Sequence, residues 1–235
     1  MMKNINSVIF DMDGVVVDGM PYHIKSWKKS LSTIGMSVTD LDIYLMEGMT
    51  GEETIKELAS KNDKFLSSEM IRKVLKLKRK IFKDIFTVKL MKGSKELLSE
   101  LHRNNYHIAL VTGTRLEVVK KVLQMGLEDI FEVIITGDMV SNGKPNPEPY
   151  LKAVNELNVR KENCLVIENA PAGIASAKSA GLKCFAVQTS LPQDYLKSAD
   201  MIFPSINDLS AFLTKTRPAK LEHFEISSQS KNITD

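Results

Sequence analysis

Short apolar runs alternate along most of the chain with stretches whose apolar residues recur at helical spacing. Nearly continuous apolar runs of this length are typical of parallel strands that are covered on both faces. Strands are predicted at residues 7–11, 107–112, 131–136, 164–168, 184–187 and 201–203. Helices are predicted between them at residues 94–104, 115–125, 147–157 and 171–180. This alternation indicates an α/β fold with a doubly wound, Rossmann-like parallel sheet.

Local signals mark the ends of two of these helices. Thr114 is followed three residues later by Glu117, which is the spacing of a capping box at the start of the helix at 115–125. Gly126 and Gly181 are predicted to end the helices that precede them.

One segment breaks the alternation. Residues 16–88 contain only helical patterns, at 21–34, 39–46, 52–60 and 68–86. We therefore predict an α/β core formed by residues 1–15 and 89–213, an inserted all-helical cap domain at 16–88, and a polar C-terminal tail at 214–235. The buried face of the last cap helix is predicted from residues at helical spacing, namely Met70, Val74, Leu77, Ile81 and Ile85.

Composition and charge narrow the class of protein. The 235 residues are 43% hydrophobic and 26% charged, as in ordinary globular proteins. The formal charge of +3 comes without a block of basic and aromatic residues, so we expect small anionic ligands and no nucleic acid. No apolar run has the length of a membrane span and no signal peptide is evident, so we expect no membrane partner and a cytoplasmic location. The two cysteines lie in apolar runs and are predicted to be inert core thiols. A monomer is the expected state.

The strongest chemical signal is Asp11-Met12-Asp13-Gly14, directly after the first predicted strand. Residues two apart in an extended chain project to the same side, so both carboxylates point to the end of the sheet where α/β proteins bind ligands. Two close carboxylates repel each other unless a cation or a shared proton relieves them, and Mg²⁺ prefers such oxygen ligands. One carboxylate can attack phosphorus while the other transfers protons. For this motif alone, an Asp-rich turn is an equally good interpretation.

A second candidate follows the next predicted strand. The Thr112 hydroxyl can hold a phosphate oxygen, and Gly113 and Thr114 open a helix whose free N–H groups attract anions. For Thr114 alone, a simple helix cap is the better interpretation.

The third candidate is Lys144 in the proline-rich segment 143–150, "GKPNPEPY", where the prolines favour a loop of fixed shape. A lysine there can act as a point charge on a phosphate and on the nucleophile. Asn146 of the same loop is a candidate for binding substrate. A solvated surface lysine is the alternative.

The fourth candidate, Glu168-Asn169, again supplies oxygen atoms at the end of a predicted strand. Both are candidate metal ligands together with Asp11 and Asp13. The alternative is an acidic first turn that the helix dipole favours.

Together these segments give a resemblance to a known family. The sequence resembles the haloacid dehalogenase superfamily, in its phosphatase and β-phosphoglucomutase-like branch with a small helical cap. The resemblance covers roughly residues 7–190 and is carried by "FDMDGVVVD" (10–18), "VTGT" (111–114), "GKPNPEPY" (143–150) and "VIENAPAGIASAKSAGL" (166–182).

The resemblance implies a role for each matching residue. Asp11 resembles the nucleophile and Asp13 the general acid and base. Thr112 and Lys144 resemble the phosphate binders. The Mg²⁺ ligands would be Asp11, Asp13 and Asn169, with Glu168 in support. Many members have Asp where this chain has Asn169, whose amide still offers an oxygen.

Residues of the predicted cap bear on the leaving group. "YHIKSW" (22–27) resembles the β-phosphoglucomutase group, in which the histidine, here His23, lies at the domain hinge. A phosphomutase grips a second phosphate with a basic cap residue, and this chain has Gly51 at that place. Glu47 of the same loop could instead reach Mg²⁺, which would suit a very small substrate such as pyrophosphate. Lys78 could add a positive charge. For Glu47 and Lys78, a solvated helix face is the alternative.

We therefore expect a Mg²⁺-dependent phosphatase that hydrolyses a small phosphorylated metabolite, either a sugar or polyol phosphate or pyrophosphate, through an aspartyl-phosphate intermediate. A sugar phosphomutase like β-phosphoglucomutase is the alternative enzyme. A non-catalytic phosphate-sensing module is the alternative outside the enzymes, and turnover of an aryl phosphate would distinguish it.

Overall fold

The computed structural model describes residues 4–215 of the chain. The predicted tail at 214–235 lies outside the described residues from residue 216 onward. Within the described part, no helix combines the length and the apolar character that crossing a membrane requires.

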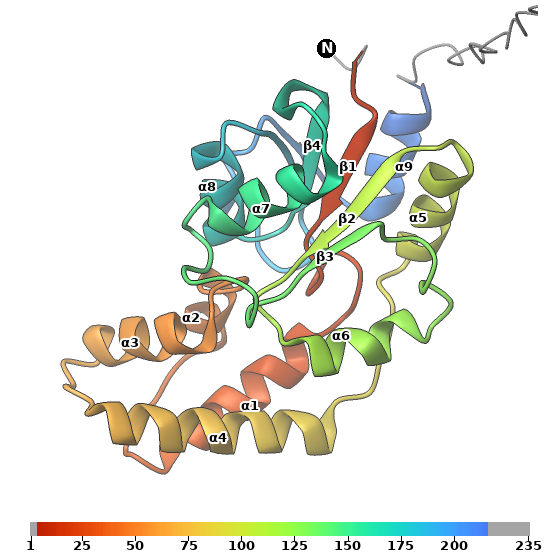
Figure 1. Cartoon of the computed structure of the whole chain (residues 1–235). Coiled ribbons are helices and arrows are strands. Elements are labelled where there is room, and N and C mark those ends of the chain that lie inside the picture. Colours follow the sequence, from red (N-terminus) through yellow and green to blue (C-terminus); the bar gives the residue numbers. More distant parts are fainter. Residues whose placement is uncertain (1–3, 216–235) are drawn as a thin grey trace, which may run out of the picture.

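A six-stranded parallel sheet forms the centre of the molecule, with the strand order β3-β2-β1-β4-β5-β6 (Figure 1). Its strands are β1 (Ser7–Phe10), β2 (His107–Val111), β3 (Val133–Ile135), β4 (Cys164–Glu168), β5 (Lys183–Val187) and β6 (Met201–Phe203). All six strands were predicted from their apolar runs. The order changes direction at β1, which pairs with both β2 and β4, so this is the switch point of the doubly wound sheet.

Helices cover both faces of the sheet. Alternate residues of β1 show why, because Val8 and Phe10 belong to one apolar cluster and Ile9 belongs to another. The first cluster packs under α5 (Ser94–Arg103), α6 (Leu116–Leu123) and α9 (Ile206–Lys215). The second packs under α7 (Glu148–Leu157) and α8 (Pro171–Ser179). Two short 3₁₀ helices lie at Lys161–Asn163 and Gln193–Tyr195.

The start of α6 differs from the sequence prediction. Its N-cap is Arg115, which makes no side-chain capping bond, so the predicted capping box of Thr114 and Glu117 is wrong. The Thr114 hydroxyl instead donates to Asp13 Oδ2 at 3.0 Å. A tertiary contact with a carboxylate has replaced the local cap. Helix α9 was not predicted.

Four helices are inserted between β1 and α5, namely α1 (Met20–Ser32), α2 (Asp40–Leu45), α3 (Gly51–Lys61) and α4 (Ser68–Ile85). We refer to residues 20–85 as the helical insertion. It has an apolar cluster of its own, in which Trp27, Leu31 and Leu58 are buried. In Figure 1 it lies beyond one end of the sheet, next to the loops that follow the strands.

The buried face of α4 is rotated from the predicted one. Its buried side chains are Ile71, Val74, Leu75, Ile81 and Phe82, whereas Met70 is 38% exposed. The helix carries two neighbouring apolar stripes, and the sequence alone does not say which of them contacts α1. The structure turns the stripe with Leu75 and Phe82 inward, so the predicted placement of Met70 is wrong.

Two chain segments connect the insertion to the sheet, and they lie side by side. The Asp18 N–H donates to the Lys89 carbonyl at 2.8 Å, and the Met91 N–H donates to the Val16 carbonyl at 2.9 Å. The outgoing and returning segments are therefore joined by backbone hydrogen bonds.

Candidate active site

The carboxyl ends of the strands bring distant segments of the chain together. Asp11 follows β1, Thr112 follows β2, and Asn169 follows β4, while Lys144 lies in the loop between β3 and α7. All four side chains are buried, with at most 5% of each residue exposed. The structure thus gathers at one edge of the sheet the residues that sequence motifs had singled out separately.

Lys144 is enclosed by three acceptors. Its ammonium group donates to Asp11 Oδ1 at 2.6 Å, to Glu168 Oε1 at 2.7 Å and to the Val111 carbonyl at 3.2 Å. Burial alone would lower the pKa of Lys144, but the charges of Asp11 and Glu168 outweigh it and raise the pKa. Lys144 is therefore a fixed positive charge beside Asp11, and it is not a solvated surface lysine.

Glu168 holds this lysine in place. Its Oε1 also accepts from the Tyr150 hydroxyl at 2.7 Å, and its Oε2 accepts from the N–H groups of Asn169 and Ala170. A carboxylate has about four acceptor positions, and here all four are used. With no acceptor position left for a metal ion, Glu168 is better suited to position Lys144 than to bind a metal directly. Sequence reasoning missed Tyr150, although it closes the "GKPNPEPY" motif.

Asp11 has one engaged and one free oxygen. Its Oδ2 is buried without a hydrogen-bond partner among the described residues. Burial raises the pKa of Asp11 to about 8, because Lys144 only partly offsets the lost hydration and Glu168 adds like charge. A buried carboxylate with a free oxygen is suited to bind a cation or to attack an electrophile.

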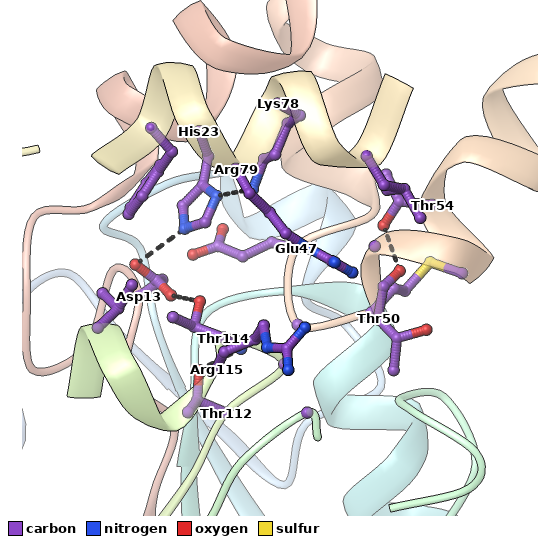
Figure 2. Close-up of a pocket in the computed structure, with 18 of the residues that line it drawn as sticks. Asp13, His23, Glu47, Thr50, Thr54, Lys78, Arg79, Thr112, Thr114 and Arg115 are labelled. Carbon is purple, nitrogen blue, oxygen red and sulfur yellow. Dashed lines mark hydrogen bonds and ion pairs between the residues drawn. The ribbon is translucent and has the colours of Figure 1, made fainter. Parts of the chain in front are cut away.

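Asp13 lies in a different environment, below the helical insertion (Figure 2). Its Oδ1 is 3.4 Å from His23 Nε2, and Lys78 Nζ lies 2.9 Å from His23 Nδ1. Burial would raise the pKa of Asp13, but His23, the Thr114 hydroxyl and Lys78 outweigh it and lower the pKa. Burial and the charge of Lys78 also lower the pKa of His23, against the pull of Asp13. A neutral His23 that accepts from Lys78 at Nδ1 carries its proton on Nε2, facing Asp13. The pKa values of the two aspartates are therefore shifted in opposite directions, up for Asp11 and down for Asp13.

Glu47 reaches the sheet edge from the loop between α2 and α3. It is 5% exposed, and its Oε1 accepts from Asn169 Nδ2 at 2.9 Å. Asn169 Nδ2 also donates to Ser190 Oγ at 2.8 Å. Burial and then the charge of Asp11 raise the pKa of Glu47 well above its ordinary value. Space for these contacts depends on Gly14, with φ +80°, because a Cβ there would lie 2.9 Å from Glu47 Oε1.

The unpartnered oxygens fit a divalent cation. Among the buried side-chain oxygens that lack hydrogen-bond partners within residues 4–215, three come from different segments of this site, namely Asp11 Oδ2, Glu47 Oε2 and Asn169 Oδ1. No group of three or more His, Cys, Asp or Glu side chains in that part of the chain is arranged to hold a metal ion. A site here would therefore depend on the Asn169 amide and on other oxygens beside the two carboxylates, as Mg²⁺ accepts.

A cavity of about 560 Å³ lies between the insertion and the sheet. This volume is typical of small-molecule sites. Predicted site residues of the sheet domain and of the helical insertion both line it. They are Asp11, Asp13, His23, Glu47, Lys78, Thr112, Gly113 and Thr114.

Asn146 is not among the lining residues of this cavity. It is exposed, and its side-chain oxygen accepts from the Glu148 N–H at 2.9 Å, in the first turn of α7. Its predicted contact with substrate therefore has no support in this geometry, because the side chain is used to start a helix.

Comparison with known proteins identifies relatives over most of the chain. The family model described as "Haloacid dehalogenase-like hydrolase" matches residues 8–187. The "Phosphorylated carbohydrates phosphatase" of Thermotoga maritima is 33% identical over 76% of this chain and 83% of its own length. The "Beta-phosphoglucomutase" of Bacillus subtilis is 29% identical over 88% and 92%, respectively. A solved structure titled "Putative beta-phosphoglucomutase from Bacteroides vulgatus" superposes with a TM-score of 0.83 at 31% identity, and the match covers 90% of this chain and 88% of that one.

Proposed function

Because the chain belongs to the haloacid dehalogenase-like hydrolases, we propose that it is a Mg²⁺-dependent phosphatase that forms an aspartyl-phosphate on Asp11. The observation that carries this proposal is the state of Asp11, which has one oxygen held by Lys144 at 2.6 Å and the other free. The proposed substrate is a small phosphorylated metabolite.

The reaction would proceed in two half-steps. Asp11 Oδ2 attacks phosphorus, the bond from phosphorus to the leaving oxygen breaks, and Asp13 gives that oxygen a proton. Asp13 then takes a proton from water, the water oxygen attacks phosphorus, and Asp11 leaves as a carboxylate. Thr112, which lines the cavity, would bind an equatorial oxygen, and Lys144 would act on the phosphate through its fixed positive charge beside Asp11. A phosphate dianion close to Asp13 raises its pKa, which favours the protonated acid in the first half-step.

The residues present fit a magnesium ion at this site. The other oxygen of the Asp11 carboxylate, Asn169 Oδ1 and the backbone carbonyl of Asp13 would hold it, and Glu47 Oε2 would add a ligand from the insertion. When bound, Mg²⁺ would neutralise charge on the phosphate and favour the ionised form of Asp11.

Glu47 bears on the size of the substrate. Its carboxylate lies next to Asn169 and would repel a second phosphate placed there, unless the metal takes up its charge. With Glu47 bound to Mg²⁺, the space beside Asp11 suits pyrophosphate or a short phosphate ester.

Two arginines favour keeping a sugar phosphomutase as the alternative. Arg79 of α4 and Arg115 before α6 line the cavity, and Figure 2 shows their guanidinium groups extending into it from opposite sides. Arg79 has no ion pair within the described residues. A second phosphate on a sugar could bind between these two guanidinium groups. They would supply the positive charge that Gly51, which has no side chain, does not.

A substrate panel tests the proposal. Phosphate release is measured from pyrophosphate, hexose phosphates and polyol phosphates, with Mg²⁺ and with a chelator. We expect release that depends on Mg²⁺ from at least one compound. Conversion of glucose 1-phosphate into glucose 6-phosphate, without release, would support the mutase instead. No turnover of any compound would remove both enzymes.

A further inference from the structure

The loop between α2 and α3, residues 46–50, contacts the sheet domain beside Lys144, and we call it the insertion loop. Its Thr50 is the N-cap of α3 and forms a capping box with Glu53. Glu53 Oε2 accepts from the Thr50 N–H at 3.0 Å and from its hydroxyl at 2.5 Å. One oxygen of this carboxylate is thus used within the insertion, as in any capping box.

The other oxygen of Glu53 leaves the insertion. Glu53 Oε1 accepts from the Gly143 N–H at 3.0 Å, and Gly143 directly precedes Lys144. The same carboxylate therefore links the first turn of α3 to the loop that carries the buried lysine. The hydrogen bond joins the insertion to the sheet domain through two residues that are 90 positions apart in the chain.

Close backbone approach surrounds this hydrogen bond. A Cβ at Gly143 would lie 2.9 Å from the Thr50 nitrogen, and a Cβ at Gly113 would lie 2.7 Å from the carbonyl oxygens of Gly48 and Met49. These distances are too short for a real side chain, so glycine is required for the insertion loop to fit between the two core loops. A Cβ at Gly48 would lie 2.9 Å from Lys144 Cδ, so the insertion loop also covers the lysine itself.

We propose that Glu53 is a positioning residue that holds the insertion loop onto the Lys144 loop and thereby completes the active site. With the loop held, Glu47 meets Asn169 and Lys144 is shielded from water. Without the Glu53–Gly143 bond, the insertion loop separates from the core more often, and both Glu47 and Lys144 lose their fixed positions. This role concerns the geometry of the site and rests on the proposed function only for its kinetic readout.

Glu53→Gln separates the two uses of this side chain. A glutamine has a single acceptor oxygen, which can serve the Thr50 N–H and keep the capping box. Its NH₂ group would then face the Gly143 N–H, and two donors cannot bond. The matched control is Asp42→Asn, which makes the same change in the Thr39–Asp42 capping box of α2. Among residues 4–215, the Asp42 side chain bonds only within the insertion, to Thr39 and Lys61, so the control leaves the core contact intact.

Two measurements test the proposal. Amide hydrogen exchange should show faster exchange at Gly143 in Glu53→Gln than in the wild type and in Asp42→Asn. With pyrophosphate and sorbitol 6-phosphate as probes, kcat/KM for Glu53→Gln should fall by about 10- to 100-fold at an unchanged melting temperature, the range expected for a hydrogen bond to a charged group. Asp42→Asn should stay within about twofold of the wild type.

Unchanged Gly143 exchange in Glu53→Gln would overturn the proposal, and so would an equal loss of kcat/KM in both variants. The exchange measurement requires no turnover. If neither probe is hydrolysed by the wild type, the proposed function is in doubt while the exchange result still decides the role of Glu53.

Discussion

Asp11 and Asp13 are two residues apart, yet their surroundings push the pKa values of their carboxyl groups in opposite directions. Asp11 is buried beside Lys144 and Glu168, and its pKa is raised to about 8. Asp13 faces His23 and Thr114, and its pKa is lowered. Different partners, supplied by different elements, thus give the two aspartates of one motif different chemical properties. The proposed roles need an ionised Asp11 and a protonated Asp13, which are the opposite of these shifts, so they depend on a cation bound beside Asp11 and a phosphate dianion beside Asp13.

Replacing Asp11, the proposed nucleophile, gives the most direct prediction at this scale. Asp11→Asn keeps the shape of the side chain but removes its nucleophilic oxygen, so turnover should fall by more than about 1,000-fold. Asp13→Asn should also reduce turnover strongly, because it removes the proton transfer. Phosphate release is measured on variants whose circular dichroism and melting temperature match the wild type. Normal turnover in a folded Asp11→Asn protein would refute the mechanism.

Lys78 gives a prediction about pH. Burial lowers the pKa of Lys78 from 10.5 to about 8, so the unfolded chain binds its proton more tightly than the folded one. The folded state is therefore penalised fully below pH 8, and the penalty disappears as the pH rises toward 10.5. Lys78→Met should raise the free energy of unfolding at pH 7 by roughly 2–3 kcal/mol, less whatever packing is lost.

Urea unfolding at pH 7 and at pH 10.5 measures this difference. The gain from Lys78→Met should be present at the lower pH and vanish at the higher one. An equal gain at both would mean that packing is responsible and that charge is not. Phosphate release by the same variant should fall, because Lys78 acts on His23 and Asp13 from the wall of the cavity.

At the scale of the element, the helical insertion depends on its own apolar cluster. Leu58 of α3 is fully buried in that cluster, whereas Leu41 of α2 is 40% exposed. Leu58→Ala should lower the free energy of unfolding by about 2–5 kcal/mol, since it removes buried methyl groups and leaves a cavity. Leu41→Ala should change it by no more than about 0.5 kcal/mol. Urea denaturation of both variants provides the comparison, and similar losses would contradict the packing described for α3.

Elements also show where the sequence was sufficient. Every strand was predicted, because a buried parallel strand needs a continuous apolar run and little else has that pattern. The buried face of α4 was not, since Met70 and Ile71 are both apolar and only the position of α1 decides between them. The Thr50–Glu53 spacing could have located the start of α3, but nothing local shows that Glu53 also bonds to Gly143.

At the scale of the whole molecule, strand order decides which residues meet. Motifs after β1, β2 and β4 converge because these strands are neighbours, and their residues could be foreseen as a group. Tyr150 and Ser190 could not, because their contacts with Glu168 and Asn169 depend on the packing of α7 and of the loop after β5. Asn146, a motif neighbour of Lys144, contacts the start of α7, and its predicted contact with substrate stays a prediction. The oligomeric state and cellular location stay predictions.

The hydrogen-bonded pair of connecting segments, at residues 16–18 and 89–91, has an evolutionary consequence. Since both ends of the insertion leave the sheet domain at one spot, the core could be closed there by a short splice. Recombination at this junction could exchange one insertion for another and leave every strand in register. A different insertion above the same residues at the sheet edge could then bind new substrates.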